Sequence, residues 1–203
     1  MSACDARAAL VVVFAGTILI GLNATMLSVA LPTVVGDLGA SPAQGTWMLL
    51  AYLVVAGAGL VLSGQLADCL DLAAVFRTGL AAFGLASLAL LGTTDAALFI
   101  AARAVQGAGS ALMLSTAAAI VSVSHPPERR RSAMGVYLAG FAIAQVSGPL
   151  VGGLVTSVLG WRWLFVVGLV IAAADLVLGR RALSRLPTRP FTGLRVDVAG
   201  NAL

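Results

Sequence analysis

Six long apolar segments divide the chain, and short polar segments separate them. The apolar segments cover residues 8–31, 44–66, 73–92, 97–121, 132–158 and 161–179. Each is close to the length of about 20 residues that a helix needs to cross a bilayer. Backbone amides in hydrocarbon must bond within their own segment, and the period-two alternation of a membrane β-barrel is absent. The pattern predicts an all-α membrane protein with six transmembrane helices.

The composition agrees with a chain whose main solvent is the lipid bilayer. Hydrophobic residues make up 60% of the 203 residues and charged residues only 10%. A soluble domain has about a quarter charged residues, so this chain has too few charges to cover a surface that faces water.

The arginines set the predicted orientation. Ten of them lie before the first segment, at the second and fourth connections, or after the last segment: Arg7, Arg77, Arg129, Arg130, Arg131, Arg180, Arg181, Arg185, Arg189 and Arg195. The connections on the other side hold only Arg162. Basic residues collect on the cytoplasmic side, so we expect a multi-pass protein of the inner (plasma) membrane with both termini cytoplasmic. Arginines placed between apolar segments indicate topology, and no nucleic acid is expected as a partner.

Three regions follow from the pattern. Residues 1–180 are expected to form a six-helix transmembrane bundle, residues 181–196 a basic cytoplasmic linker, and residues 197–203 the start of a truncated further helix. A weak internal repeat pairs residues 64–76 with residues 153–165. These two junctions lie on opposite sides of the membrane, which an inverted repeat of three plus three helices predicts.

Arg103 is the most informative residue, because it lies inside the fourth segment. An arginine within a span costs several kcal/mol and should face a polar cavity or a partner. Gln106 follows it by three residues and so lies on the same helical face. The alternative is an arginine whose long side chain reaches the membrane surface. Gly107 and Gly109 would let another helix approach closely.

The fifth segment carries a second concentration of small residues: Gly140, Gly148, Pro149, Gly152 and Gly153. Proline removes one backbone hydrogen bond, and the glycines leave a smooth helix face. This face is either a generic packing seam or the kinked seam that shapes and seals a transport path. Gly64 and Asp68 end the second segment, where the carboxylate either meets water or belongs to a gate.

These segments resemble those of a known family. Arg103–Ala111 looks like the R-x-x-Q-G-x-G motif of the major facilitator superfamily, residues 148–153 like its G-P-x-x-G-G antiporter motif, and residues 64–68 like the start of its G-x-L-A-D-R-x-G-R-R loop. Residues 22–32 and 161–165 resemble L-D-x-T-x-V-N-V-A-L-P and W-R-W-I-F of the fourteen-span drug:proton antiporters. The chain is similar to the N-terminal half of such a transporter.

The resemblance implies a function. It implies proton-driven export of small lipophilic, often cationic compounds by alternating access, with a C-terminal helical half that is missing here. Arg103 would tune the charge of the central cavity, residues 148–153 would seal it, and Asp68 would lie at the inner gate. Protons, a small lipophilic substrate and the missing half are the implied partners.

Several residues depart from the family pattern. Cys69, Asp71, Leu72 and Ala73 stand where the loop motif has Arg, Gly, Arg and Arg. Asn23 replaces the usual acidic residue of the first helix, and asparagine cannot exchange a proton near neutral pH. These losses favour the alternative function, a truncated, transport-inactive fragment or remnant.

Asp175 is then the only carboxylate clearly inside a predicted span. We expect it to reach the interface beside Arg180 and Arg181, with a proton-relay role as the alternative. Trp47, Trp161 and Trp163 fit an aromatic belt, although Trp47 and Tyr52 could instead stack on a lipophilic substrate. His125 is expected to be solvated, and residues 129–131 to touch anionic lipid heads.

An enzyme has little support in this sequence. There is one histidine, no cluster with metal-ligand spacing and no glutamate inside a span. No cofactor or metal is therefore expected.

Overall fold

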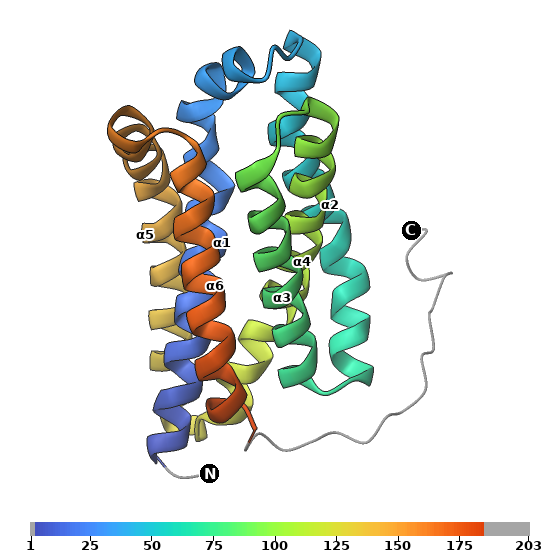
Figure 1. Ribbon diagram of the computed structural model, residues 1–203. Helices are drawn as coiled ribbons and strands as arrows, with labels where there is room; N and C mark the ends of the chain where they lie inside the picture. The colour runs from blue at the N-terminus through green and yellow to red at the C-terminus, as the bar shows by residue number, and fades with distance from the viewer. Residues whose placement is uncertain (1–2, 185–203) are drawn as a thin grey trace.

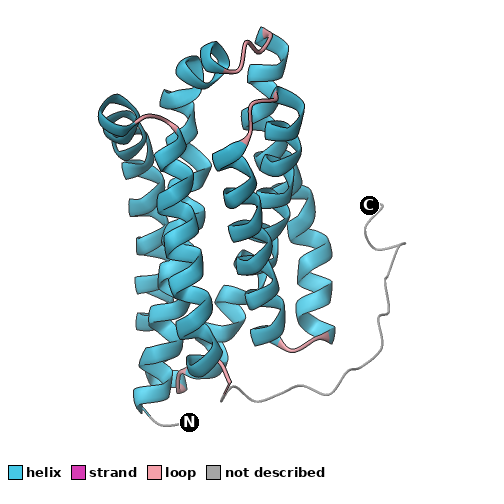
Figure 2. Ribbon diagram, viewed as in Figure 1, coloured by secondary structure: helices cyan, strands magenta, loops and turns pink. Residues whose placement is uncertain are grey.

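The computed structural model describes residues 3–184, without the side chains of residues 3, 4 and 68. In this range the chain is all α-helical (Figures 1 and 2). The six helices are α1 (Ala3–Asp37), α2 (Pro42–Cys69), α3 (Leu72–Gly92), α4 (Ala96–Ser124), α5 (Pro127–Leu159) and α6 (Arg162–Ala182). All six are long and apolar enough to cross a membrane, which confirms the predicted fold class.

Polar side chains cap the starts of α2, α3 and α4, which begin slightly before the apolar segments. Ser41 accepts a hydrogen bond from the backbone N–H of Gln44 and forms a capping box with it at the start of α2. Asp71 and Asp95 accept backbone N–H groups at the starts of α3 and α4. Pro32 does not end α1, which continues to Asp37 rather than stopping near residue 31.

Helices that are neighbours in the sequence are not the main packing partners. α1 packs against α5 and α6, α4 packs against α2 and α3, and α1 meets α4 in the centre. Figure 1 shows α5, α6 and α1 together on one side and α2, α3 and α4 on the other. When α1, α2 and α3 are matched with α4, α5 and α6 in order, each packing pair of one set corresponds to a packing pair of the other. A three-plus-three repeat predicts this arrangement.

The start of α1 and the end of α6 lie at the same end of the bundle, which we call the N-terminal end (Figure 1). The loops α2–α3 and α4–α5 lie there too, and the other three loops lie at the opposite end. An even number of crossings requires this placement. The predicted linker covers residues 181–196, and its first residues, Arg181 and Ala182, belong to α6. Residues 185–203, which hold the rest of this linker and the predicted further helix, lie outside the described residues.

At the opposite end, α6 is attached to α1 through Trp161 and Arg162. The Trp161 indole donates a hydrogen bond to Asp37 Oδ2 at 2.8 Å, and Arg162 pairs with the same oxygen at 3.8 Å. The Trp161 ring packs edge-on against Phe99 and Phe165. Trp161 is therefore a buried anchor, and its predicted place in an aromatic belt is wrong.

Candidate functional site

Arg103 lies buried between α1, α2 and α4, with 1% of its surface exposed. Its Nη1 donates hydrogen bonds to Asn23 Oδ1 and to Gln106 Oε1, the latter at 2.8 Å. Its Nε donates to the Met48 carbonyl oxygen at 3.3 Å. The side chain therefore meets polar partners inside the bundle and does not reach the membrane surface.

The partners of Arg103 belong to a larger network. Gln106 Nε2 donates to Ser87 Oγ on α3 at 2.8 Å. The Arg103 guanidinium carbon lies 4.4 Å from the centre of the Tyr52 ring, close enough for a cation–π contact. The Tyr52 hydroxyl lies 3.0 Å from Ser110 Oγ. Polar contacts thus connect α1, α2, α3 and α4 in the middle of the bundle.

We call this cluster the polar core. It consists of Asn23, Tyr52, Ser87, Arg103, Gln106 and Ser110. No carboxylate of the described residues pairs with Arg103, so neutral oxygens and an aromatic ring balance its charge. Asn23 Nδ2 has no hydrogen-bond partner within the same range. The arrangement can therefore accept a further oxygen ligand at Asn23.

A cavity of about 200 Å³ lies beside the polar core, and we call it the groove. Its lining residues come from α1, α2, α4 and α5, and α2 and α5 are the least buried of these four helices. Its lining residues are Ile20, Ala24, Tyr52, Leu53, Ala56, Gly57, Leu60, Ser110, Ala111, Leu114, Phe141 and Gln145. None of them is charged. Tyr52 and Ser110 belong to both features, so the groove directly borders the polar core.

Small residues on α4 bring its neighbours close. A Cβ atom on Gly107 would meet the Tyr52 carbonyl of α2, and one on Gly109 would lie 2.7 Å from the Gly79 carbonyl oxygen of α3. Both glycines therefore pack against another helix, as the sequence predicted. Gly64 has open space at its Cβ position, so no close packing requires a glycine there.

The small residues of α5 form a seam against α1. A Cβ atom on Gly148 would overlap the Thr25 hydroxyl, one on Gly152 would overlap the Met26 carbonyl oxygen, and one on Gly140 would overlap the Phe14 ring. Gly153 is different, because its Cβ position is 3.4 Å from a Val29 methyl group and makes ordinary contact.

Pro149 gives the same seam a polar contact. Proline has no N–H, so the Gln145 carbonyl one turn earlier loses its helical donor. Thr25 Oγ1 on α1 donates to this carbonyl oxygen at 2.9 Å instead. A hydroxyl of the neighbouring helix thus satisfies the carbonyl that proline frees inside the membrane.

Asp175 is buried rather than at the interface, with 2% of its surface exposed. Neither carboxylate oxygen has a hydrogen-bond partner within the described residues. Its Oδ2 lies 3.1 Å from the position that a Cβ on Gly16 would take, beside Phe76 and Met113. The expectation that Asp175 meets water beside Arg180 and Arg181 is therefore wrong, and it occupies an apolar site.

Asp71 and Arg77, the charged residues described near the junction of α2 and α3, bond to backbone groups of α3. Asp71 caps α3, and Arg77 Nε donates to the Ala73 carbonyl oxygen of its own helix at 3.1 Å. Asp68 belongs to the last turn of α2, and its side chain lies outside the described part of the chain. A gating role for Asp68 stays a prediction.

Sequence reasoning missed several residues of the site: Thr25, Ser87, Ser110 and Gln145. Gln145 carried a signal, because it is a polar residue inside a span and stands one turn before Pro149. The three hydroxyl residues carried none, since serine and threonine in membrane helices commonly bond to their own backbone. Among the described residues, no cluster of histidine, cysteine or carboxylate side chains could hold a metal ion.

Comparison with known proteins gives a consistent result. The profile of the Major Facilitator Superfamily matches residues 13–196. A puromycin resistance protein of Streptomyces alboniger is 36% identical over 96% of this chain and 38% of its own length. The cephamycin export protein of Amycolatopsis lactamdurans is 35% identical over 98% of this chain and 41% of its own length. The chain thus spans about two fifths of these curated relatives.

Proposed function

The chain belongs to the major facilitator superfamily of membrane transporters, and from this premise we propose that it forms the substrate-carrying bundle of a proton-driven exporter of lipophilic compounds. The observation that supports this most is the groove next to the polar core. A lipophilic molecule suits an uncharged groove in which a few polar groups fix its orientation. The relatives include resistance and export proteins and are transporters rather than enzymes.

The polarity of the groove bears on the substrate. Ser110 and Gln145 supply polar atoms, while the other groove residues apart from Tyr52 are apolar. Arg103 lies behind Tyr52, so a cation in the groove would face a buried positive charge. A neutral lipophilic compound fits this bundle better. Export of cationic compounds would need carboxylates from outside the groove.

A second helical bundle completes the proposed transporter. α2 and α5 flank the groove and are mostly unburied, with exposed side chains at Leu53, Val61, Val146 and Leu150 among others. In alternating access, two bundles rock against each other around a central site. We place the second bundle over the face that carries α2, α5 and the groove. The two halves of such transporters are parallel repeats, so a second copy of this chain can supply it.

We place the coupling proton at Asp175. A buried carboxylate without a partner is costly, and proton uptake removes the charge. The basic residues on the helices packed around it do not bond to it: Arg7, Arg77, Arg103, Arg180 and Arg181. In this proposal the chain lies in the plasma membrane with both chain ends on the cytoplasmic side, because the arginines gather at the N-terminal end of the bundle.

Transport in proteoliposomes tests the proposal. The chain is reconstituted, and a fluorescent lipophilic dye is followed with and without a pH gradient. We expect gradient-driven dye movement that Arg103→Ala lowers and Arg131→Gln leaves unchanged. Asp175→Asn should abolish the response to the gradient but keep dye exchange between the two sides. Absence of dye movement by the unaltered chain would overturn the proposal and favour a transport-inactive fragment.

A further inference from the structure

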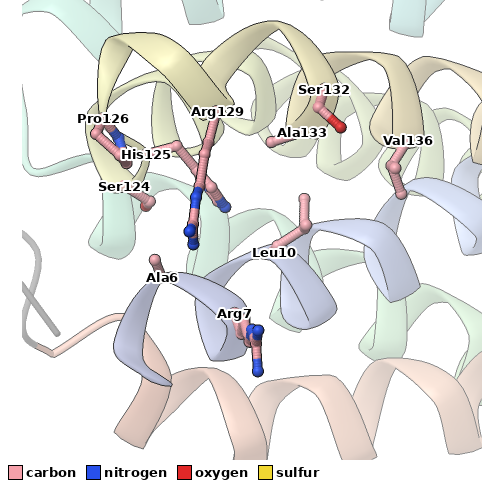
Figure 3. A pocket seen from close by; sticks show the side chains of 10 residues that line it. All are labelled: Ala6, Arg7, Leu10, Ser124, His125, Pro126, Arg129, Ser132, Ala133 and Val136. Carbon is pink, nitrogen blue, oxygen red and sulfur yellow. The ribbon is translucent and has the colours of Figure 1, made fainter. Parts of the chain in front are cut away.

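A second cavity lies at the N-terminal end, far from the groove along the bundle, between α1, the end of α4 and the start of α5. Its volume is about 530 Å³. Its lining residues are Ala6, Arg7, Leu10, Ser124, His125, Pro126, Arg129, Ser132, Ala133 and Val136 (Figure 3). We call it the basic pocket. Pockets of this volume hold small organic ligands.

One end of the basic pocket is cationic. Figure 3 shows the Arg129 side chain extending from α5 toward α1, with the His125 ring beside it. Arg7 lies on the α1 wall, and no acidic residue is among the lining residues. Asp5 and Glu128 are near in sequence but do not line the pocket. In the same figure the Arg7 side chain points away from Arg129, beyond the α1 backbone, so Arg129 is the arginine that faces the cavity. Its guanidinium favours a ligand with an anionic oxygen group.

Ser124 gives an independent sign of a ligand. The side chain is 5% exposed and lies on the pocket wall beside Arg129. Its hydroxyl oxygen has no hydrogen-bond partner among the described residues. Serine hydroxyls usually satisfy themselves on the preceding turn, so an unused hydroxyl at a cationic cavity is a free donor for an anion.

The start of helix α5 also favours an anionic ligand at this pocket. His125 Nδ1 donates to the Val121 carbonyl oxygen at 3.1 Å, which fixes the ring at the end of α4. Helix α5 starts at this pocket, and its cap residue Pro126 makes no side-chain hydrogen bond to the first turn. The positive end of the α5 dipole therefore adds to the arginine charge.

The other end of the basic pocket is mostly apolar, although Ser132 also lies there. Leu10, Ala133 and Val136 line it, and they continue into the membrane-crossing parts of α1 and α5. In Figure 3 they lie further along the two helices than Arg129 and Ser124. A free phosphate would use only the basic end. A lipid uses both ends, because its phosphate group meets Arg129 and the start of an acyl chain meets the apolar side chains.

We propose that the basic pocket binds the headgroup of an anionic phospholipid. Its phosphate accepts hydrogen bonds from Arg129 and Ser124 at the start of α5. Anionic lipids concentrate in the cytoplasmic leaflet, where the arginine distribution places this end of the bundle. The site is separate from the groove and does not depend on transport.

The test uses the purified chain in a neutral detergent. The thermal unfolding midpoint is followed while short-chain phosphatidylglycerol, matching phosphatidylcholine or inorganic phosphate is added. We expect a saturable rise with phosphatidylglycerol and a much weaker response to the other two. Arg129→Gln should raise the half-saturating concentration about tenfold, and Ser124→Ala about threefold. Val136→Ser should also weaken the lipid response, because it replaces an apolar side chain of the pocket wall with a polar one.

Arg131→Gln is the matched control, since it removes the same charge from α5 outside the basic pocket. Its half-saturating concentration should stay within about twofold of the unaltered chain. An equal effect of Arg131→Gln and Arg129→Gln would show diffuse surface charge and overturn the site. An equal response to inorganic phosphate would overturn the lipid as ligand. Should Arg129→Gln fail to fold, an unchanged response of Ser124→Ala would overturn the proposal.

Discussion

Arg103 is a buried cation whose recorded hydrogen-bond acceptors are all uncharged. Insertion of an arginine at the centre of a membrane helix costs about 2.5–3.5 kcal/mol. Each hydrogen bond to a charged group returns about 1.5–3 kcal/mol. Three such bonds offset the cost, so the loss of a single acceptor should be measurable.

Asn23 offers the cleanest test of this balance. Asn23→Ala removes the α1 acceptor and should lower the free energy of unfolding by about 1.5–3 kcal/mol. Asn23→Asp restores an acceptor and adds a negative charge, so it should be more stable than Asn23→Ala. Chemical unfolding in detergent measures both. Ser157→Ala is the control, because the Ser157 hydroxyl donates to the Leu154 carbonyl oxygen of its own helix turn, which is exposed. Equal stability of Asn23→Ala and the control would refute the role of Asn23.

The sequence indicated some residues of the site better than others. Arg103 and Gln106 could be predicted because charge and amide groups are rare within a span. Asp175 was misplaced because α6 was expected to end at residue 179, whereas it continues to Ala182. Asp175 also lies on the face of α6 that packs against α1 and α3, which buries it. A carboxylate near a helix end can be buried or exposed, and only packing decides which.

The seam between α1 and α5 shows how one element depends on another. Gly148 and Gly152 let α1 approach so closely that no side chain fits, and Thr25 satisfies the carbonyl that Pro149 frees. The motif predicted a close seam. It did not predict the partner, because nothing in the sequence says that the fifth helix packs on the first.

Gly152 and Gly153 form a matched pair for testing the seam. Gly152→Ala places a methyl group against the Met26 backbone and should cost about 1–3 kcal/mol. Gly153→Ala makes ordinary contact with Val29 and should stay within about 0.5 kcal/mol. Unfolding in detergent compares them on the same helix. A similar loss of unfolding free energy for both variants would mean that α1 does not pack closely against Gly152.

A double-mutant cycle tests the contact between Thr25 and the Gln145 carbonyl. Thr25→Val removes the donor and should cost about 0.6 kcal/mol, the average for a hydrogen bond between membrane helices. Pro149→Ala restores an N–H that can serve the same carbonyl. In that background Thr25→Val should cost measurably less, which gives a positive coupling energy. Strict additivity of the two changes would contradict the contact.

At the scale of the whole molecule, hydropathy was enough to predict six helices and arginine counts were enough to propose their orientation. The pairing of the helices required structure, since α1 packs on α5 and α6 while α4 packs on α2 and α3. The groove depends on this pairing, because its lining residues come from α1, α2, α4 and α5. Residues as far apart as Ile20 and Gln145 share it, and no local pattern connects them.

The central claim is that the groove, and not the lipid-facing side, is the path of the substrate. Gly57 lines the groove and has space for a side chain, whereas Val170 is an exposed mid-helix residue of α6 away from it. The chain, with Cys4 and Cys69 replaced by serine, is reconstituted in proteoliposomes. Labelling of an introduced cysteine by a water-soluble thiol reagent is then measured. We predict that Gly57→Cys is labelled and that a lipophilic dye protects it, while Val170→Cys stays unlabelled. Equal labelling of the two positions, or no protection of Gly57→Cys by the dye, would contradict the account.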